Sequence, residues 1–346
     1  MDFTPRRIAI IKPSALGDIV HALPVLAALR STFPEAPIAW VVNKSFAPLL
    51  AGHPDLNETI AFDRGIGKRG ALRAAKYAVS FGRELRRRRF DLVIDLQGLL
   101  RSGLMTRATG AAVRVGFANA REGSRLAYTH RVEISGAESM HAVDRYWKVA
   151  EFLGAGAGPK RFHVLVDPEA RAWAANELRD LPRPIVAVAV GAKWVTKRWP
   201  PAHFAALLRD VPGTCVFLGS ADDTPLSLKA IRGLNGPSRD FTGKTAIPQL
   251  AALLSESDIM VGNDTGPLHL AAALGVPCVA PYTCTKIAKH GPYGLFSGAL
   301  ETTVPCGGSY IKTCPNMICM SELGPAKLEP KLAEAIRTWS LRSRSA

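Results

Sequence analysis

The chain has 346 residues, of which 47% are hydrophobic and 21% charged, and its formal net charge is +15. This length is typical of about two domains, and the composition excludes a disordered chain. No apolar stretch approaches the roughly 18 residues that a membrane-spanning helix needs. The opening residues, MDFTPRRIAII, lack the order of a signal peptide, so we expect a cytosolic protein.

The first half of the chain alternates apolar strands with helices. Strands are predicted at 7–12, 38–42, 58–63, 90–98 and 113–117. Helices are predicted at 19–32, 45–52, 69–89, 99–110 and 141–154. A series of this kind builds a parallel sheet with helices on both faces.

The segment 154–163, GAGAGPKRFH, is Gly-rich and typical of a linker. After it, strands are predicted at 184–190, 213–220, 259–264 and 277–282, and helices at 168–181, 202–211, 223–234, 247–258 and 265–275. We therefore predict an α/β protein with two doubly wound, Rossmann-like domains, 1–153 and 164–324, facing a central cleft. A C-terminal helix over 325–346 is expected to follow, with the option of returning to the N-terminal domain.

The loop after the first strand carries Gly17 and Asp18 in the stretch KPSALGDIVHALPVL. Ligands of open α/β sheets bind at the carboxyl ends of strands, and a carboxylate there can act as a general base. Asp18 could equally cap the helix that follows. His21, one turn further along, is the rival candidate for the base.

The stretch VGNDTGPLHLAAALGVP joins a strand to a helix. Asp264 or Thr265 is a good N-cap, and Gly266 lets a ligand approach the backbone. The free N–H groups and the helix dipole favour an anion such as a diphosphate, although a plain capped helix would show the same pattern. His269 falls on the first turn, where a histidine is more often a structural hydrogen-bonding group.

Two further strand-end loops carry charge. Lys193, Lys197 and Arg198 suit a phosphate-bearing ligand, with surface solubility as the alternative. Asp222 or Asp223 could accept hydrogen bonds from ribose hydroxyls or simply cap a helix.

From Arg64 to Arg89 the chain has ten Lys or Arg residues and one acidic residue. Such a field attracts nucleic acid, anionic lipid or a phosphorylated glycan, and a solvated helix face is the alternative. Late in the chain, Cys306, Cys314 and Cys319 form no CxxC pair. Ordinary thiols are favoured there over a zinc site, and no metal site is predicted.

No P-loop or DxD motif is present. The segments KPSALGDIVHALPVL, FDLVIDLQGLLRSGLMTRATG, VRVGF, KRWP, LGSADD and VGNDTGPLHLAAALGVP resemble, in this order, the ADP-heptose:lipopolysaccharide heptosyltransferases of glycosyltransferase family nine. The heptosyltransferase I members are the most similar, and the likeness runs from Arg7 to about Pro325. It implies a GT-B fold and an inverting, metal-independent transfer of heptose from ADP-heptose to an acceptor hydroxyl, without a cofactor.

The resemblance also implies residue roles. Asp18 matches the general base, and Lys197 a lysine that contacts phosphate and sugar. The positions that match donor contacts are Lys193, Lys197, Asp222, Thr245, Asp264, Thr265, Gly266 and His269. Ala192-Lys193 stands where heptosyltransferase I has a Thr-Thr pair, so the donor nucleotide and sugar stay open.

The resemblance implies an anionic acceptor, a Kdo-bearing lipid A or a related inner-core glycolipid, met at the cytoplasmic surface of the inner membrane. The matching cations are Arg64, Lys68, Arg69 and Arg73, and Arg121, Gln97 and Arg101 are weaker candidates for the acceptor site. The alternatives are a non-hydrolysing nucleotide-sugar epimerase and a nucleic-acid-binding protein. No nucleic-acid partner is expected under the leading interpretation.

Overall fold

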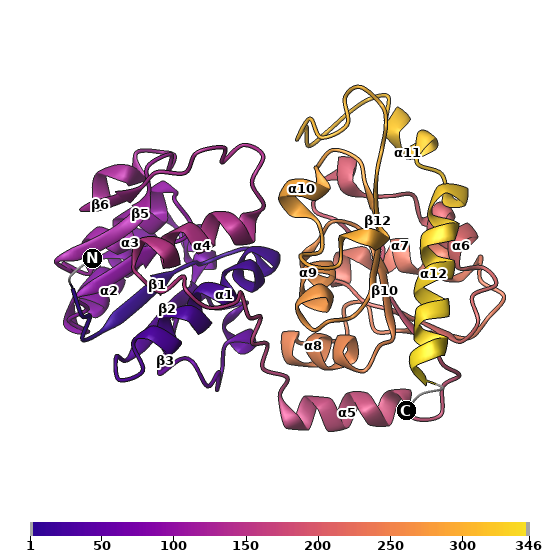
Figure 1. Ribbon diagram of the computed structural model, residues 1–346, viewed down its shortest axis with the longest axis horizontal. Helices are drawn as coiled ribbons and strands as arrows, with labels where there is room; N and C mark the ends of the chain where they lie inside the picture. Colours follow the sequence, from indigo (N-terminus) through magenta and orange to yellow (C-terminus); the bar gives the residue numbers. More distant parts are fainter. Residues whose placement is uncertain (1–2, 344–346) are drawn as a thin grey trace. The chain divides into compact units, whose positions relative to one another are not determined.

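The computed structural model describes residues 3–343, except the side chains of Lys68 and Arg69. Internal contacts divide the chain between Leu165 and Val166 into an N-terminal and a C-terminal unit. Each unit holds one parallel six-stranded sheet with helices packed on it (Figure 1). The predicted α/β class with two doubly wound units is therefore confirmed. The boundaries at 153 and 164, and a return of the last helix to the N-terminal domain, stay predictions.

The N-terminal sheet has the strand order β3-β2-β1-β4-β5-β6. Its strands are β1 (Ile8–Ile11), β2 (Ile38–Asn43), β3 (Glu58–Phe62), β4 (Leu92–Asp95), β5 (Val113–Phe117) and β6 (His130–Val132). Its α-helices are α1 (Leu16–Thr32), α2 (Ala71–Arg87), α3 (Leu100–Ala108) and α4 (Ala142–Phe152). Three short 3-10 helices are η1 (Ala47–Leu49), η2 (Arg64–Arg69) and η3 (Ser124–Ala127).

Helices cover both faces of this sheet. Phe81 and Leu85 of α2 and Met105 of α3 share one hydrophobic cluster with Ile11 and Val93 of the sheet. Helices α1 and α4 pack together on the opposite face, because right-handed crossovers that run in opposite directions put their helices on opposite faces. All four residues of β1 are buried for this reason.

The C-terminal sheet has the order β12-β11-β10-β7-β8-β9. Its strands are β7 (Ile185–Ala189), β8 (Thr214–Phe217), β9 (Ser238–Asp240), β10 (Ile259–Gly262), β11 (Cys278–Tyr282) and β12 (Ala299–Glu301). Its α-helices are α5 (Pro168–Leu178), α6 (Pro201–Leu208), α7 (Thr224–Ile231), α8 (Ile247–Ser255), α9 (Gly266–Ala273), α10 (Ile287–His290), α11 (Ile318–Glu322) and α12 (Pro325–Ser343). Short 3-10 helices are η4 (Val195–Lys197), η5 (Ala221–Asp223) and η6 (Phe296–Gly298).

Helix α12 belongs to the core of the C-terminal unit, where it packs against α6 and β11 (Figure 1). Its Leu328 and Leu332 are buried in the same hydrophobic cluster as Trp199. The Trp199 indole N–H donates to the carbonyl oxygen of Leu323 over 2.7 Å, just before the helix begins. The last helix therefore closes a core that the sheet alone would leave open.

Both sheets reverse their strand order next to the first strand of the unit. The chain moves from β1 to β2 and β3 on one side and then to β4 on the other, and it repeats this from β7 to β10. The loops that follow these two strand pairs diverge at the carboxyl edge, which is where doubly wound sheets bind ligands. The fold thus marks one candidate region in each unit.

Local differences from the sequence-based elements have simple causes. The helix predicted from residue 19 begins at Leu16, which places Asp18 in its first turn. The basic helix predicted over 69–89 is α2, which begins at Ala71 because Gly70, with a φ of 107°, separates it from η2. Strands β6, β9 and β12 have three residues each and were not predicted. Within residues 3–343, no helix is long and apolar enough to cross a bilayer.

The packing of α12 predicts the stability effect of shortening one of its side chains. Leu328→Ala should lower the free energy of unfolding of the C-terminal unit by about 2–5 kcal/mol, because it opens a cavity beside α6 and β11. The exposed Arg337 on the same helix provides the matched control, and Arg337→Ala should change stability by less than about 0.5 kcal/mol. Urea unfolding of the full chain measures both, and equal effects would contradict the placement of α12.

Candidate functional site

The N-terminal unit holds Asp18 in a cluster with Lys12 and Tyr146, which we call the Asp18 cluster. The hydroxyl of Tyr146, from α4, donates to Asp18 Oδ1 over 3.0 Å. Lys12 Nζ, from the residue after β1, lies 3.7 Å from the same oxygen. The backbone N–H of Ala15 donates to Asp18 Oδ2 over 3.2 Å. Asp18 therefore bonds to the start of its helix with one oxygen and meets a cation and a phenol with the other.

The two charges of this cluster differ in exposure. The Lys12 side chain is 2% exposed, whereas that of Asp18 is 41% exposed. Desolvation raises the pKa of Asp18, but the Lys12 ammonium and the hydrogen bonds from Ala15 and Tyr146 outweigh it, and the pKa lies below its ordinary value. The site thus presents an ionised carboxylate to solvent at neutral pH, fixed from behind by a buried ammonium.

His21, the rival candidate, is only 4% exposed. Its ring packs edge-on against that of His141 at a centroid distance of 5.2 Å, and His141 caps α4 by accepting the N–H of Val143. The exposed carboxylate of Asp18 is therefore better placed than His21 to receive a proton from a ligand.

The loop after β4 lies beside the Asp18 loop, as the strand order requires. The N–H of Ser14 donates to Gln97 Oε1 over 3.4 Å. Asp95, fully buried, accepts the N–H groups of Gln97 and Gly98 on Oδ1 and the Tyr128 hydroxyl on Oδ2. Its carboxylate fixes the turn that carries Gln97.

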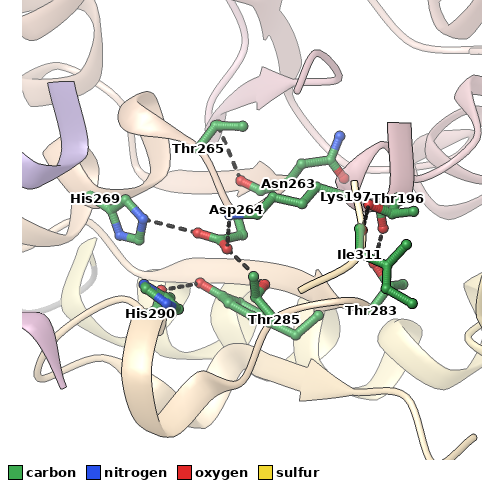
Figure 2. Close-up of polar contacts among 11 residues, drawn as sticks. Thr196, Lys197, Asn263, Asp264, Thr265, His269, Thr283, Thr285, His290 and Ile311 are labelled. Carbon is green, nitrogen blue, oxygen red and sulfur yellow. Dashed lines mark hydrogen bonds and ion pairs between the residues drawn. The ribbon is translucent and has the colours of Figure 1, made fainter. Parts of the chain in front are cut away.

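The C-terminal unit gathers a second cluster around Asp264, shown in Figure 2. Lys197 Nζ lies 2.5 Å from Asp264 Oδ2, and the Thr285 hydroxyl donates to the same oxygen over 2.7 Å. His269 Nε2 lies 3.0 Å from Oδ1. These residues, the Asp264 cluster, come from the loops after β7, β10 and β11 and from the first turn of α9.

The Asp264 cluster exposes its cation instead of its carboxylate. Asp264 is 4% exposed at its side chain and Lys197 is 18% exposed. Desolvation raises the pKa of Asp264, but the hydrogen bond from His269 and the Lys197 ammonium more than offset it, so the pKa lies far below the ordinary value of 3.8. The ammonium also lies 4.8 Å from the centre of the Trp194 ring, which restrains its position.

The turn between β10 and α9 leaves the start of that helix without a side-chain cap. Thr265 is the N-cap residue, but it makes no side-chain capping hydrogen bond. Its hydroxyl donates instead to the carbonyl oxygen of Asn263, and Asp264 turns toward Lys197. The capping role expected for Asp264 or Thr265 is therefore not the one their side chains have, and the helix end carrying Gly266 keeps its positive dipole for a ligand.

The loops after β8 and β9 lie side by side at the same edge. The N–H of Gly243 donates to the carbonyl oxygen of Gly219, and a Cβ at Gly243 would lie 2.8 Å from Ala221 Cα. Asp223 is the structural member of its pair, because Oδ2 accepts both the N–H and the hydroxyl of Ser220. Asp222 remains exposed beside it.

With this geometry in view, similarity to known proteins becomes informative. A family model described as glycosyltransferase family 9 (heptosyltransferase) matches residues 78–317, more than half of the chain. The chain belongs to glycosyltransferase family 9. It is accordingly a glycosyltransferase, as the resemblance of its motifs indicated.

Individual relatives agree with the family. The chain is 30% identical over 318 residues to "Lipopolysaccharide heptosyltransferase 1" of Pseudomonas aeruginosa, covering 89% of this chain and 87% of the relative. A solved family 9 glycosyltransferase from Veillonella parvula superposes with a TM-score of 0.83 at 23% identity, covering 99% of both chains. The structure titled "E. coli heptosyltransferase WaaC with ADP-2-deoxy-2-fluoro heptose" superposes with a TM-score of 0.72 at 25% identity, covering 95% of this chain and 99% of that one.

These neighbours identify the fold of the enzyme as the GT-B fold. They give no support to the epimerase or the nucleic-acid-binding interpretation.

The remaining candidate residues of this heptosyltransferase lie apart from the two clusters. Lys193 is exposed, Thr245 is half-buried, and Arg198 turns back to donate to the carbonyl oxygen of Ala192. Arg64, Arg73 and Arg121 are exposed on the N-terminal unit, as is Arg101, whose guanidinium lies 5.7 Å from the centre of the Phe62 ring. The side chains of Lys68 and Arg69 lie outside the described residues, so their acceptor role stays a prediction.

The late cysteines show no metal-binding arrangement. Among the described residues, the only group of three ligand atoms within 4.8 Å of one another is His53, Asp55 and His163. His53 already uses both ring nitrogens there, with Nε2 at 2.7 Å from the carbonyl oxygen of His163 and Nδ1 accepting the N–H of Asp55. Hydrogen bonding within the chain accounts for this group.

Several residues of the two clusters were not singled out from the sequence. Lys12 is a charge that directly follows four fully buried strand residues, which is a signal that could have been used. Thr285 likewise follows strand β11 at the carboxyl edge. Tyr146 lies 128 residues from Asp18 in sequence, and Trp194 reads as an ordinary loop aromatic. For these two, only the tertiary structure brings out the contact.

The Asp264 cluster predicts a pH-dependent stability. Asp264→Asn should lower the free energy of unfolding at pH 7 by about 3 kcal/mol, because it leaves the Lys197 ammonium without its carboxylate. Since the native pKa lies below the unfolded value of 3.8, this contribution is complete above that value and is lost only as pH falls below it. Urea unfolding at pH 7, 5 and 3 tests this.

The exposed Asp222 provides the control, and Asp222→Asn should leave stability within about 0.5 kcal/mol. A difference between native and Asp264→Asn protein that disappears already at pH 5 would contradict the direction of the shift.

Proposed function

We propose that this enzyme transfers a heptose from ADP-heptose to a Kdo-bearing lipid A or a related inner-core acceptor of lipopolysaccharide, with inversion at the anomeric carbon and without a metal ion. One observation carries the proposal: the N-terminal unit exposes a fixed, ionised carboxylate at its switch point and the C-terminal unit exposes a fixed ammonium at its own. These are the two groups that such a transfer needs. The similarity to a lipopolysaccharide heptosyltransferase adds the substrate class.

The reaction uses the carboxylate as a base. An acceptor hydroxyl oxygen forms a bond to the anomeric carbon while its proton passes to Asp18. The bond between that carbon and the phosphate oxygen breaks, and ADP leaves from the opposite face with the electron pair. A carboxylate of low pKa removes the proton late, when the hydroxyl has already become acidic through bond formation.

Negative charge grows on the departing diphosphate, and the C-terminal unit is built to stabilise it. Lys197 supplies a positive charge whose place is fixed by Asp264 and Trp194, and fixed donors stabilise a transition state without reorganising. Thr265 and Gly266 supply backbone donors at the start of α9, and the Thr265 hydroxyl becomes a further donor if it leaves the carbonyl oxygen of Asn263. Lys193 adds charge in place of the Thr-Thr pair of heptosyltransferase I.

The other donor contacts have distinct roles in the proposal. Asp222 is proposed to bind the ribose, and the loop at Thr245 to read the adenine. A backbone hydrogen bond between Gly243 and Gly219 joins the two loops, so one nucleoside can meet both. Both oxygens of Asp264 are occupied, so it acts on the sugar mainly by positioning Lys197. His269 holds the second oxygen of Asp264 and fixes that orientation.

The acceptor is proposed to bind the N-terminal unit at the cytoplasmic surface of the inner membrane. The exposed Arg64, Arg73 and Arg121, together with Lys68 and Arg69, supply positive charge to an anionic glycolipid. The ten Lys or Arg residues between Arg64 and Arg89, against one acidic residue, would draw such a lipid to this unit.

A donor panel tests the nucleotide. ADP-heptose should raise the unfolding temperature of the protein, because a ligand at 100 times its Kd stabilises by about 2.7 kcal/mol. GDP- and UDP-linked sugars at the same concentration should give a much smaller shift, and Lys197→Ala should reduce the shift with ADP-heptose. A larger shift with a GDP- or UDP-linked sugar would show that the proposed donor is wrong.

Replacement of the base tests the chemistry. Asp18→Ala should lower kcat by about 100-fold or more, since a positioned base contributes on that order. The Kd for ADP-heptose, measured by calorimetry, should stay nearly unchanged because Asp18 belongs to the other unit. His21→Gln is the comparison, and a larger loss of kcat in that variant than in Asp18→Ala would transfer the role of base to His21.

A further inference from the structure

A pocket opens between α2 and α3 on the N-terminal unit, with a volume of about 250 Å³. We call it the α2–α3 pocket. Its floor is apolar, because Phe81 of α2 and Met105 of α3 line it and also belong to the hydrophobic cluster on that face of the sheet. None of the candidate catalytic or donor-binding residues lines it. The core of this unit is therefore open to the surface here, outside the Asp18 cluster, while Arg64 and Arg101 of the lining are also candidate acceptor contacts.

Small side chains keep the pocket open. Ala74, Ala78 and Gly82 line it from successive turns of α2. A Cβ at Gly82 would lie 3.5 Å from Ala108 Cβ, so α2 and α3 approach closely at that end. Because these residues are small, a volume that larger side chains would occupy is open to a ligand. This volume corresponds to about eight water-sized groups.

Exposed apolar side chains are frequent on the two helices that form the pocket. Leu72 is 70% exposed on α2, and Leu104, which lines the pocket on α3, is 60% exposed. Two more large apolar side chains, Val79 and Leu100, are also exposed on these helices. Four of the twelve large hydrophobic residues exposed within the described part of the chain thus lie on two helices.

The positive charge beside the pocket favours an anionic lipid over the apolar surface of another protein as the partner. Arg64 and Arg101 line the pocket, and both are exposed. Helix α2 carries Arg73, Lys76 and Arg83 and only one acidic residue. A surface that combines exposed leucines with basic residues partitions to the interface of an anionic bilayer, where the apolar groups enter the acyl region and the cations meet the headgroups.

We propose that α2 and α3 lie on an anionic membrane surface and that the α2–α3 pocket takes a fatty-acyl chain of a bilayer lipid, whose phosphate headgroup meets Arg64 and Arg101. The apolar floor suits a hydrocarbon chain. The polar lining residues Asp63 and Tyr77 already accept hydrogen bonds within the chain, from the N–H groups of Gly65 and Asp63. The inference rests on the proposed function in placing the enzyme at a membrane and shares Arg64 with the proposed acceptor site, but its test does not depend on transfer.

The test is co-sedimentation of the full chain with vesicles, at about 0.1 M salt so that charges are screened beyond roughly 10 Å. The native protein should bind vesicles of phosphatidylglycerol and phosphatidylcholine more strongly than vesicles of phosphatidylcholine alone. Ala74→Phe fills the pocket without changing charge and should lower the partition coefficient roughly fivefold or more, because chain insertion is lost. Ala75→Phe adds the same group one residue away, at an exposed position outside the pocket, and should not lower it.

A second pair of variants provides an independent measurement in case Ala74→Phe does not fold. Leu104→Glu should weaken vesicle binding, whereas Leu228→Glu, at an exposed leucine of α7 in the C-terminal unit, should not. Unfolding temperatures establish that all four variants are folded. Equal vesicle binding by Ala74→Phe and native protein, or no preference of the native protein for anionic vesicles, would overturn the inference.

Transfer to an acceptor without acyl chains separates the two proposals. If such transfer proceeds while vesicle binding ignores the pocket variants, the inference fails and the proposed function stands. If vesicle binding follows the variants as expected and no heptose is transferred to any acceptor, the proposed function fails and the inference stands.

Discussion

The structure depends on two lysine–aspartate pairs, one at the point where each sheet reverses its strand order. Burial decides what each pair offers. In the N-terminal unit the ammonium of Lys12 is buried and the carboxylate of Asp18 is exposed, whereas in the C-terminal unit Asp264 is buried and Lys197 is the more exposed partner. A buried charge needs a partner, so each pair also orients the charge that solvent or substrate meets. The two units thus share one architecture, but at the switch point the N-terminal unit exposes a negative charge and the C-terminal unit a positive charge.

Each exposed charge is fixed by an aromatic neighbour as well as by its ionic partner. Tyr146 reaches Asp18 from α4, and Trp194 lies beside Lys197 within its own loop. A group held on several sides loses little freedom when a ligand binds, which is what positioned catalysis requires. This arrangement lowers the stability of the core, because Lys12 and Asp264 occupy places that apolar side chains would otherwise fill.

Much of this organisation could be predicted from the sequence, because buried parallel strands are continuous apolar runs and the residues that follow them are the ones at the ligand edge. Asp18, Lys197 and Asp264 were found in this way. Tyr146 was not, since a tyrosine in an amphipathic helix gives no sign of a carboxylate far away in the chain. The short strands β6, β9 and β12 were missed because three residues at a sheet edge are too few to show a period. The break at Gly70 needed the backbone angle itself.

Helix α12 has a consequence for how the protein is made. Its Leu328 and Leu332 complete the core of the C-terminal unit, and they follow every strand of its sheet in the sequence. The N-terminal unit is built from one continuous earlier stretch that ends at Leu165, so it can fold while translation continues. In the C-terminal unit, the part of the core that α12 covers, beside α6 and β11, stays exposed until synthesis has passed Leu332. Folding of this unit therefore ends later than that of the N-terminal unit and leaves apolar surface exposed for longer.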